Sequence, residues 1–240
     1  MKNQKDRDLK MGVFFRQLKL SLRTFLGFTR VLVQLIYGVW QIGKLPHPII
    51  TIFGSARHLA TRAYGTHAFL LAEKCTEQGI SVLTGGGPGI MEAANCGFFR
   101  QKTGKGRTLG IGVTNLQEKP NKCAHTYIQL DYFFARKWLL MNYSKAFVVF
   151  PGGFGTLDEF AELLTLIQTK RLKAVPVFLV GTVYWTPLVT WLSTIVLQEG
   201  AVDKKDVALI TLVDHIDEIL PVLHRICHTE VFLRHRKKEE

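Results

Sequence analysis

Short apolar runs alternate with longer segments of helical periodicity along most of this chain. The runs have the length of buried strands, and the segments between them repeat apolar residues every three or four positions. The runs are Ile49–Phe53, Ile80–Leu83, Leu109–Val113, Ala146–Phe150 and Val175–Val180. The expected helices are Tyr64–Gln78, Met91–Gln101, Tyr132–Ser144, Leu157–Thr169, Tyr184–Gln198 and His215–Cys227. Strands joined by such helices predict an α/β fold, a Rossmann-like doubly wound parallel sheet flanked by helices.

The first 45 residues follow a different pattern. Apolar residues dominate from Lys10 to Ile42, and basic residues recur at helical spacing on one face, at Arg16, Lys19, Arg23 and Arg30. This predicts an extra N-terminal amphipathic helix. Its longest uncharged run, Val31 to Gly43, is too short to span a bilayer alone. Two alternatives stay open: residues 10–42 contact a membrane surface, or the helix packs on the domain or across an oligomer interface.

The pattern divides the chain into three parts: a basic helical extension (1–45), a Rossmann-like domain (46–228) and a basic polar tail (229–240). The net charge is +12, but residues 1–50 alone hold nine basic and two acidic side chains. The domain is therefore close to neutral. A nucleic-acid-binding domain would carry its basic stripe on the folded body, so we expect no nucleic-acid partner.

The four cysteines, Cys75, Cys96, Cys123 and Cys227, are far apart in the sequence and form no Cys-x-x-Cys motif. Thiols spaced in this way are typical of reduced cysteines in the cytoplasm. We therefore expect a cytoplasmic protein with no bound metal and no disulfide framework.

Ligands of doubly wound sheets bind where strands end and loops lead into helices. The first expected strand is followed by Gly54 and Ser55, where a glycine would let a ligand approach the backbone. The second is followed by a glycine-rich loop that contains Gly86 and Gly87 and opens a helix near Met91. Such a loop can direct free N–H groups at an anion. Its spacing matches neither the dinucleotide nor the Walker motif, and a tight packing turn is the alternative.

A third loop, Pro151–Glu159, follows the most strand-like run of the chain. Three of its residues lack side chains where an anion would come close, namely Gly152, Gly153 and Gly155. Thr156 is the expected N-cap, and the free N–H groups of the first helical turn would complete a phosphate-sized nest. Glu159 follows Thr156 by three residues, so a capping box is a purely structural alternative for this pair.

Arg136 and Lys137 lie on the expected helix Tyr132–Ser144, just before the strand that leads into this third loop. Both side chains are expected to point at the crevice beside the loop. Two cations, a glycine nest and a carboxylate suit a phosphorylated sugar, because the cations and the nest would hold the phosphate. The carboxylate of Glu159 would then meet the ribose or stabilise positive charge.

These residues resemble those of the LOG (LONELY GUY) phosphoribohydrolases, which were long mislabelled as lysine decarboxylases. Pro151–Glu159 matches the Pro-Gly-Gly-x-Gly-Thr-x-x-Glu signature of that family. Arg136, Lys137 and Met141 match its Arg-Lys-x-x-Met helix. The glycine run ending at Met91 matches a third element, one residue shorter than in the family.

The resemblance implies hydrolysis of the N-glycosidic bond of a nucleoside 5′-monophosphate, with AMP or an N6-substituted AMP as first choice. The products would be a free base and ribose 5-phosphate. Arg136 and Glu159 would be catalytic, Lys137 would assist with the nucleotide, and Gly152, Gly153, Gly155 and Thr156 would hold the phosphate. No cofactor is implied, and a homo-oligomer, a dimer or larger, is expected.

The loop Gly54-Ser55-Ala56-Arg57 departs from the Gly-Ser-Ser of the compact plant-type members. Whether cytokinin nucleotides are substrates therefore stays open. The alternative function is that of a non-catalytic protein of the same fold that binds or carries a nucleotide or the molybdenum cofactor.

Overall fold

The fold of this chain is centred on one parallel sheet. The computed structural model describes residues 2–57, 62–98, 105–114, 116 and 119–226, and among these the side chains from residue 11 onward except that of residue 62. The expected tail 229–240 and Cys227 lie outside the described residues. The strands are β1 (Ile49–Phe53), β2 (Ser81–Thr84), β3 (Thr108–Val113), β4 (Thr126–Leu130), β5 (Phe147–Val149), β6 (Val177–Val180) and β7 (Ile210–Val213).

The seven strands are ordered β4-β3-β2-β1-β5-β6-β7, and every neighbouring pair is parallel. The chain starts in the middle with β1, extends the sheet to one side through β4, and then crosses back to β5. This reversal between β1 and β5 is the switch point of a doubly wound sheet. The predicted α/β fold is thus confirmed.

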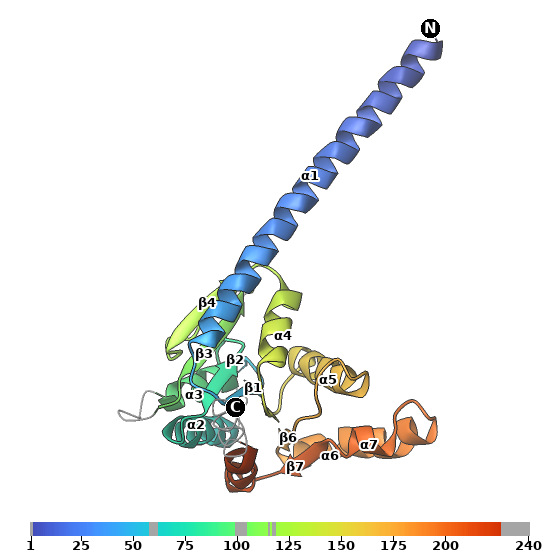
Figure 1. Ribbon diagram of the computed structural model, residues 1–240. Helices are drawn as coiled ribbons and strands as arrows, with labels where there is room; N and C mark the ends of the chain where they lie inside the picture. Colours follow the sequence, from blue (N-terminus) through green and yellow to red (C-terminus); the bar gives the residue numbers. More distant parts are fainter. Residues whose placement is uncertain (1, 58–61, 99–104, 115, 117–118, 227–240) are drawn as a thin grey trace, which may run out of the picture.

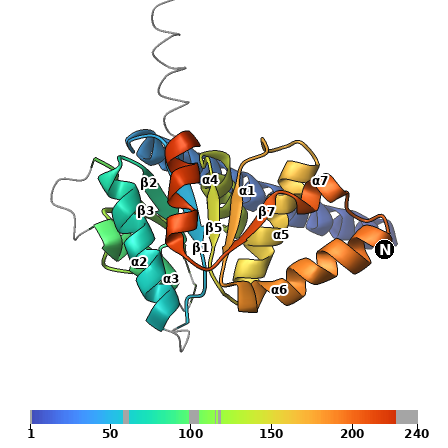
Figure 2. The same ribbon diagram turned by 90° about the horizontal axis from the view of Figure 1, so that it is seen from below.

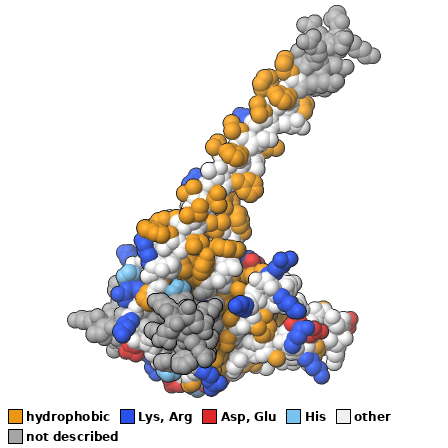
Figure 3. Space-filling model, in the orientation of Figure 1, with side chains coloured by type: hydrophobic (Ala, Val, Ile, Leu, Met, Phe, Trp, Pro, Cys, Tyr) orange, Lys and Arg blue, Asp and Glu red, His pale blue; other side chains and the backbone are white. Residues whose placement is uncertain are grey.

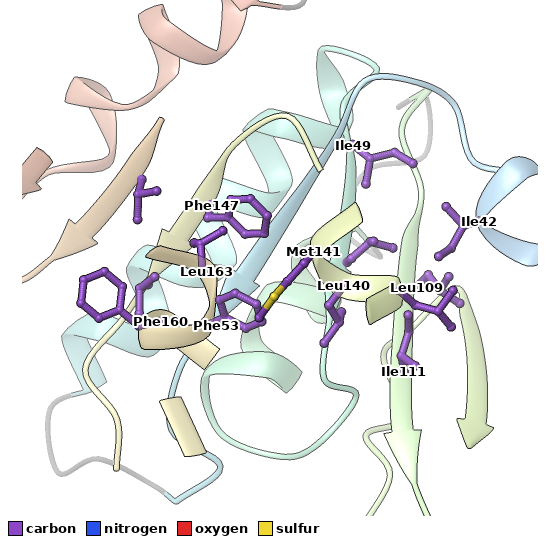
Figure 4. Packing of buried hydrophobic residues seen from close by; sticks show 14 of the residues in the cluster. Ile42, Ile49, Phe53, Leu109, Ile111, Leu140, Met141, Phe147, Phe160 and Leu163 are labelled. Atoms are coloured by element: carbon purple, nitrogen blue, oxygen red, sulfur yellow. The ribbon is translucent and has the colours of Figure 1, made fainter. Parts of the chain in front are cut away.

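Helices cover both faces of the sheet (Figures 1 and 2). They are α1 (Lys2–Gly43), α2 (Arg62–Glu77), α3 (Ile90–Gly97), α4 (Phe133–Asn142), α5 (Phe154–Gln168), α6 (Thr182–Trp191) and α7 (Lys204–Val207). One face packs against α4, α5 and the end of α1, where Phe53, Met141 and Phe160 share a core (Figure 4). The other face packs against α2, α3 and the C-terminal helical segment 216–226 through a second core that includes Leu71, Ile90 and Ile219.

Two strands, β4 and β7, were not predicted from the sequence. Both lie at the edges of the sheet, where burial is incomplete and polar residues such as Gln129 and Thr211 interrupt the apolar run. An uninterrupted apolar run is the pattern of a central strand that is buried on both faces. The expected helix Tyr184–Gln198 also differs, since α6 gives way to a π-helical segment at Leu192–Val196.

The prediction that all thiols are reduced is wrong for one pair, because Cys96 and Cys123 form a disulfide. Cys96 lies on α3, and Cys123 lies in the segment that leads into β4. The sheet order brings these two segments together although 27 positions separate the cysteines. Spacing along the chain gave no sign of this contact. Cys75 is a free, buried thiol, as predicted.

The N-terminal helix α1 is 42 residues long and projects from the domain (Figure 1). Only its C-terminal part packs on the domain, against α4 and β4. There Gln34 and Asp131 exchange two hydrogen bonds: the Gln34 amide donates to the carboxylate over 2.8 Å, and the Asp131 N–H donates to the Gln34 side-chain oxygen over 3.0 Å. Arg30 forms an ion pair with the same Asp131. The segment Met11–Gly43 is long and apolar enough, by length and composition, to cross a membrane.

The contact between α2 and α3 yields a first prediction. A Cβ on Gly97 would lie 2.3 Å from the carbonyl oxygen of Phe69 on α2, whereas a Cβ on Gly65 would meet nothing within 4 Å. We expect Gly97→Ala to lower the free energy of unfolding by roughly 1–3 kcal/mol, because the two helices must separate. Gly65→Ala should raise it by up to about 1 kcal/mol through helix propensity. Urea unfolding of both variants checks this, and equal effects would contradict the close packing.

Candidate active site

A cleft of about 640 Å³ opens at the carboxyl ends of β1 and β5, the switch point of the sheet. It is lined by the loop after β1, the start of α3, the face of α4 that carries Arg136, the start of α5 and the start of α6. The side chains and glycines of the cleft that figure below are Gly54, Ser55, Met91, Phe133, Arg136, Lys137, Gly152, Gly153, Gly155, Thr156, Asp158, Glu159 and Tyr184. Among the described residues, no three His, Cys, Asp or Glu side chains gather as metal ligands would.

A buried ion pair forms the floor of this cleft. Nη2 of Arg136 lies 2.8 Å from Oε1 of Glu159, and the two side chains are only 8% and 10% exposed. Arg136 comes from α4 and Glu159 from the second turn of α5, so the pair joins the two helices that flank β5. Because a buried charge without a partner costs several kcal/mol, each residue fixes the position of the other.

Burial raises the pKa of the Glu159 carboxyl above its ordinary value, and the charge and hydrogen bond of Arg136 act in the opposite direction. Lys137 also lowers this pKa, whereas the nearby carboxylate of Asp158 raises it. A buried carboxyl with a raised pKa and a charged partner in a cleft is typical of groups that exchange protons or stabilise developing charge.

Lys137 lies beside this pair. Its Nζ is 2.6 Å from Oδ2 of Asp158 and 2.8 Å from Oε2 of Glu162. Desolvation acts to lower the pKa of Lys137, but the hydrogen bonds to the two carboxylates outweigh it and raise the pKa. Lys137 is therefore held as a cation at the edge of the cleft.

The start of α5 differs from the predicted one. The helix begins at Phe154, and Gly153 is its N-cap residue without a side-chain hydrogen bond. Thr156 therefore lies inside the first turn, so its predicted N-cap position is wrong. The capping box is wrong as well, because Glu159 bonds to Arg136. The first-turn N–H groups have no capping side chain and open onto the cleft, as an anion-binding helix terminus requires.

Gly152 is required by packing. A Cβ there would lie 2.1 Å from the Thr156 hydroxyl oxygen, so only glycine lets the loop fold over the buried Thr156 side chain. The carbonyl of Gly152 accepts a hydrogen bond of 2.5 Å from the hydroxyl of Tyr184 on α6. The loop between β5 and α5 is thus fixed from both sides.

The glycine-rich loop after β2 is placed differently from the prediction. Met91 lines the cleft, but Gly86 and Gly87 do not; they contact the segment before β4, where Asn121 donates to the carbonyl of Gly87. Gly85 of this loop was not among the predicted site residues, but it lies against Arg136. A Cβ there would lie 2.5 Å from Nη2 of Arg136, so its lack of a side chain makes room for the guanidinium.

At the end of β1, Gly54 and Ser55 both line the cleft. A Cβ on Gly54 would lie 2.6 Å from the Ile90 side chain. The carbonyl of Ser55 accepts a hydrogen bond from the N–H of Ile90, which fixes the loop against the start of α3. Ser55 also accepts a hydrogen bond on its hydroxyl from the N–H of Arg57.

Phe133 and Tyr184 line the cleft as well, and neither was predicted to do so. The guanidinium of Arg136 lies 5.9 Å from the centre of the Phe133 ring. Aromatic residues are as common in a hydrophobic core as in a ligand site. The sequence therefore contained no signal that Phe133 and Tyr184 line the cleft.

Comparison with known proteins assigns the family. Residues 91–223, more than half of the chain, match the family model described as "Possible lysine decarboxylase". The chain is 28% identical over 110 residues to a pyrimidine/purine nucleotide 5′-monophosphate nucleosidase of Escherichia coli, a match that covers 42% of this chain and 24% of the enzyme. It is 29% identical over 124 residues to a probable cytokinin riboside 5′-monophosphate phosphoribohydrolase of Arabidopsis thaliana, covering 50% of this chain and 59% of that protein.

Among solved structures, a molybdenum cofactor binding protein of Rippkaea orientalis shares the fold. Its TM-score is 0.56 at 20% identity, and the alignment covers 75% of this chain and 96% of that one. The chain spans less than two thirds of the length of the curated relatives it matches. It belongs to the LOG family, as the resemblance of its motifs indicated.

The geometry of the loop before α5 yields a second prediction. Gly152→Ala should lower the free energy of unfolding by roughly 1–3 kcal/mol, because the new methyl group would overlap the Thr156 hydroxyl. Gly155→Ala is the matched control, since a Cβ there would meet nothing within 4 Å. Thermal unfolding of the two variants measures the difference. If Gly152→Ala were as stable as Gly155→Ala, the described fold of this loop would be wrong.

Proposed function

We propose that the protein hydrolyses the N-glycosidic bond of a nucleoside 5′-monophosphate, with AMP or an N6-substituted AMP as the preferred substrate. The observation that carries this proposal is the buried pair of Arg136 and Glu159 on the floor of a cleft that also holds an uncapped helix terminus. The names of the two curated relatives describe the same class of reaction on nucleotides.

The start of α5 is suited to the phosphate. Gly153 and Gly155 have open space where a side chain would be, so an anion can approach the backbone N–H groups. The helix dipole adds a favourable partial positive charge at this end. Lys137 lies at the edge of the same cleft, where its ammonium group pairs with Asp158 and Glu162. A monophosphate held there would place its ribose over the cleft floor.

Glu159 is suited to the bond-breaking step. As the bond from C1′ to the base nitrogen breaks, positive charge develops on the ribose, and a fixed carboxylate beside it is stabilising. A water molecule then bonds to C1′ and gives up one proton, which Glu159 can accept and pass on. The electron pair of the broken bond leaves with the base, which takes up a proton. The products are the free base and ribose 5-phosphate.

Arg136 holds Glu159 in place, and its charge and hydrogen bond favour the ionised carboxylate against the burial that raises the pKa. Its Nε is buried without a hydrogen-bond partner among the described residues. The guanidinium therefore has donor capacity beyond the Glu159 contact, which a water or a substrate oxygen can use.

Substitution of Glu159 tests the proposal. Wild-type protein is incubated with AMP, GMP, CMP, UMP and an N6-substituted AMP, and free base is followed by chromatography. Glu159→Gln should lower the rate of base release by at least about 100-fold, the range for loss of a proton-transferring group. Glu162→Gln is the matched control: it makes the same chemical change one turn further along α5, where the side chain is 38% exposed, and should change the rate by less than about tenfold.

Two outcomes would overturn the proposal. If Glu159→Gln left base release unchanged, Glu159 would not be the catalytic group. No release from any monophosphate, together with tight binding of a nucleotide or of the molybdenum cofactor, would favour the non-catalytic alternative.

The pH dependence of the rate gives a further prediction. If the carboxylate form of Glu159 is required, the rate should rise with pH through a midpoint above the ordinary pKa of glutamate, because burial raises this pKa. Asp158→Asn removes a negative charge that raises the pKa of Glu159, so the midpoint should move to lower pH. Lys137→Met removes a positive charge and should move it to higher pH. Profiles of kcat against pH check both directions, and two shifts of the same sign would contradict the assignment.

A further inference from the structure

Helix α1 carries an apolar face that no described residue of the chain covers. From Met11 to Trp40, fifteen of its large apolar side chains are 45–67% exposed. At 3.6 residues per turn the exposed residues Phe14, Leu18, Leu22, Phe25, Leu32, Ile36 and Trp40 fall on one side of the helix. With a rise of 1.5 Å per residue, this face is about 44 Å long. Figure 3 shows the apolar side chains along the projecting helix.

This face points away from the domain. The residues of α1 that are buried against the domain, Val31, Gly38 and Ile42, lie on roughly the opposite side of the helix. A Cβ on Gly38 would lie 2.4 Å from the Leu139 side chain, so the helix is closely packed on α4 there. A flat apolar surface could therefore contact the helix along its whole length without meeting the domain.

From Leu9 onward the charges of α1 are all of one sign. The chain contains no Asp or Glu from Leu9 to Ala72. Arg16, Lys19 and Arg23 fall within an arc of about 60° on the flank of the apolar face. A helix with one broad apolar face and basic residues beside it is typical of helices that lie in the headgroup region of a membrane.

A second copy of α1 is a poorer partner than an anionic surface. Helices that pair as coiled coils bury a narrow apolar seam and place opposite charges beside it. On α1 the positions beside the apolar face include Leu26, Phe28 and Val33, which are themselves apolar and not charged. Because α1 has no acidic residue after Asp8, two copies would bring like charges together.

A transmembrane arrangement is also disfavoured. Every stretch of about 20 residues within Met11–Gly43 contains at least one basic residue, and the stretch 24–43 would bury Arg30, at a cost of about 2.5–3.5 kcal/mol near the membrane centre. The uncharged remainder, residues 31–43, has a length of only about 20 Å and is packed on the domain along one side.

We propose that α1 lies in the plane of an anionic lipid surface. The face from Met11 to Trp40 enters the boundary between headgroups and acyl chains, and Arg16, Lys19 and Arg23 contact the lipid phosphates. The domain then sits on the aqueous side of α1. This inference is independent of the proposed catalytic activity.

Sedimentation of the full-length protein with vesicles tests the proposal. The protein should bind vesicles of phosphatidylcholine mixed with phosphatidylglycerol at least tenfold more tightly than phosphatidylcholine alone, and salt should weaken the binding. Arg16→Gln, Lys19→Gln and Arg23→Gln together should lower the affinity by about fivefold per charge at low salt. No binding to the mixed vesicles would overturn the proposal.

The apolar face is tested by Leu18→Asp with Phe25→Asp, both at exposed positions of α1. This double variant should lose vesicle binding while its circular dichroism and thermal unfolding remain those of the wild type. The matched control, Thr186→Asp with Thr190→Asp, makes the same change in charge at exposed positions of α6 and should bind with at least a third of the wild-type affinity. Equal binding by the two double variants would contradict a role for this face.

The orientation is tested with sealed vesicles and an N-terminal epitope tag. A helix in the plane of the surface leaves the tag open to protease added outside. Protection of the tag would show a helix that spans the bilayer and would overturn the in-plane arrangement. A dimer in solution that is lost in the Leu18→Asp/Phe25→Asp variant, without vesicle binding by the wild type, would show that a second copy covers the face.

Discussion

The buried ion pair between Arg136 and Glu159 is the constraint on which the site depends. Two charges taken out of water are tolerated only when they pair closely, so α4 and α5 must approach each other over the end of β5 at one fixed distance. Gly85 leaves room for the guanidinium, and Gly152 lets the preceding loop fold over Thr156. These two glycines are therefore required because they leave space for the neighbouring side chains of Arg136 and Thr156.

The order of the strands explains why these groups meet. Since β1 and β5 are neighbours at the reversal of the sheet, the loops that follow them diverge and leave a cleft between Ser55 and Gly152. The start of α5 then presents its free N–H groups on one side of the cleft, and Glu159 presents its carboxylate one turn deeper. An anion site and a carboxylate in one cleft suit the phosphate and the ribose of the proposed substrate. The proposed function thus rests on the topology of the sheet together with a few side chains.

Much of the fold and of the candidate site was predictable from the sequence. Apolar runs indicate buried strands, and glycines indicate places where another group comes close to the backbone. The strand Ile49–Phe53 was predicted with its observed bounds, and Arg136 and Glu159 were expected in one crevice. What the sequence could not show depends on contacts between distant segments. The disulfide of Cys96 and Cys123, and the position of Gly86 away from the cleft, arise from the sheet order. A Thr-x-x-Glu spacing fits both a capping box and the observed pair with Arg136, so only the structure could decide between them.

The structure of the Glu159→Gln protein bound to AMP would test the central claim most directly. The account predicts the phosphate at the N–H groups of the first turn of α5, near Gly153 and Gly155. It predicts C1′ of the ribose beside the side chain of residue 159. A phosphate held elsewhere, for example at the glycine loop around Gly86, would contradict the account. So would a ribose whose C1′ lies out of contact with residue 159.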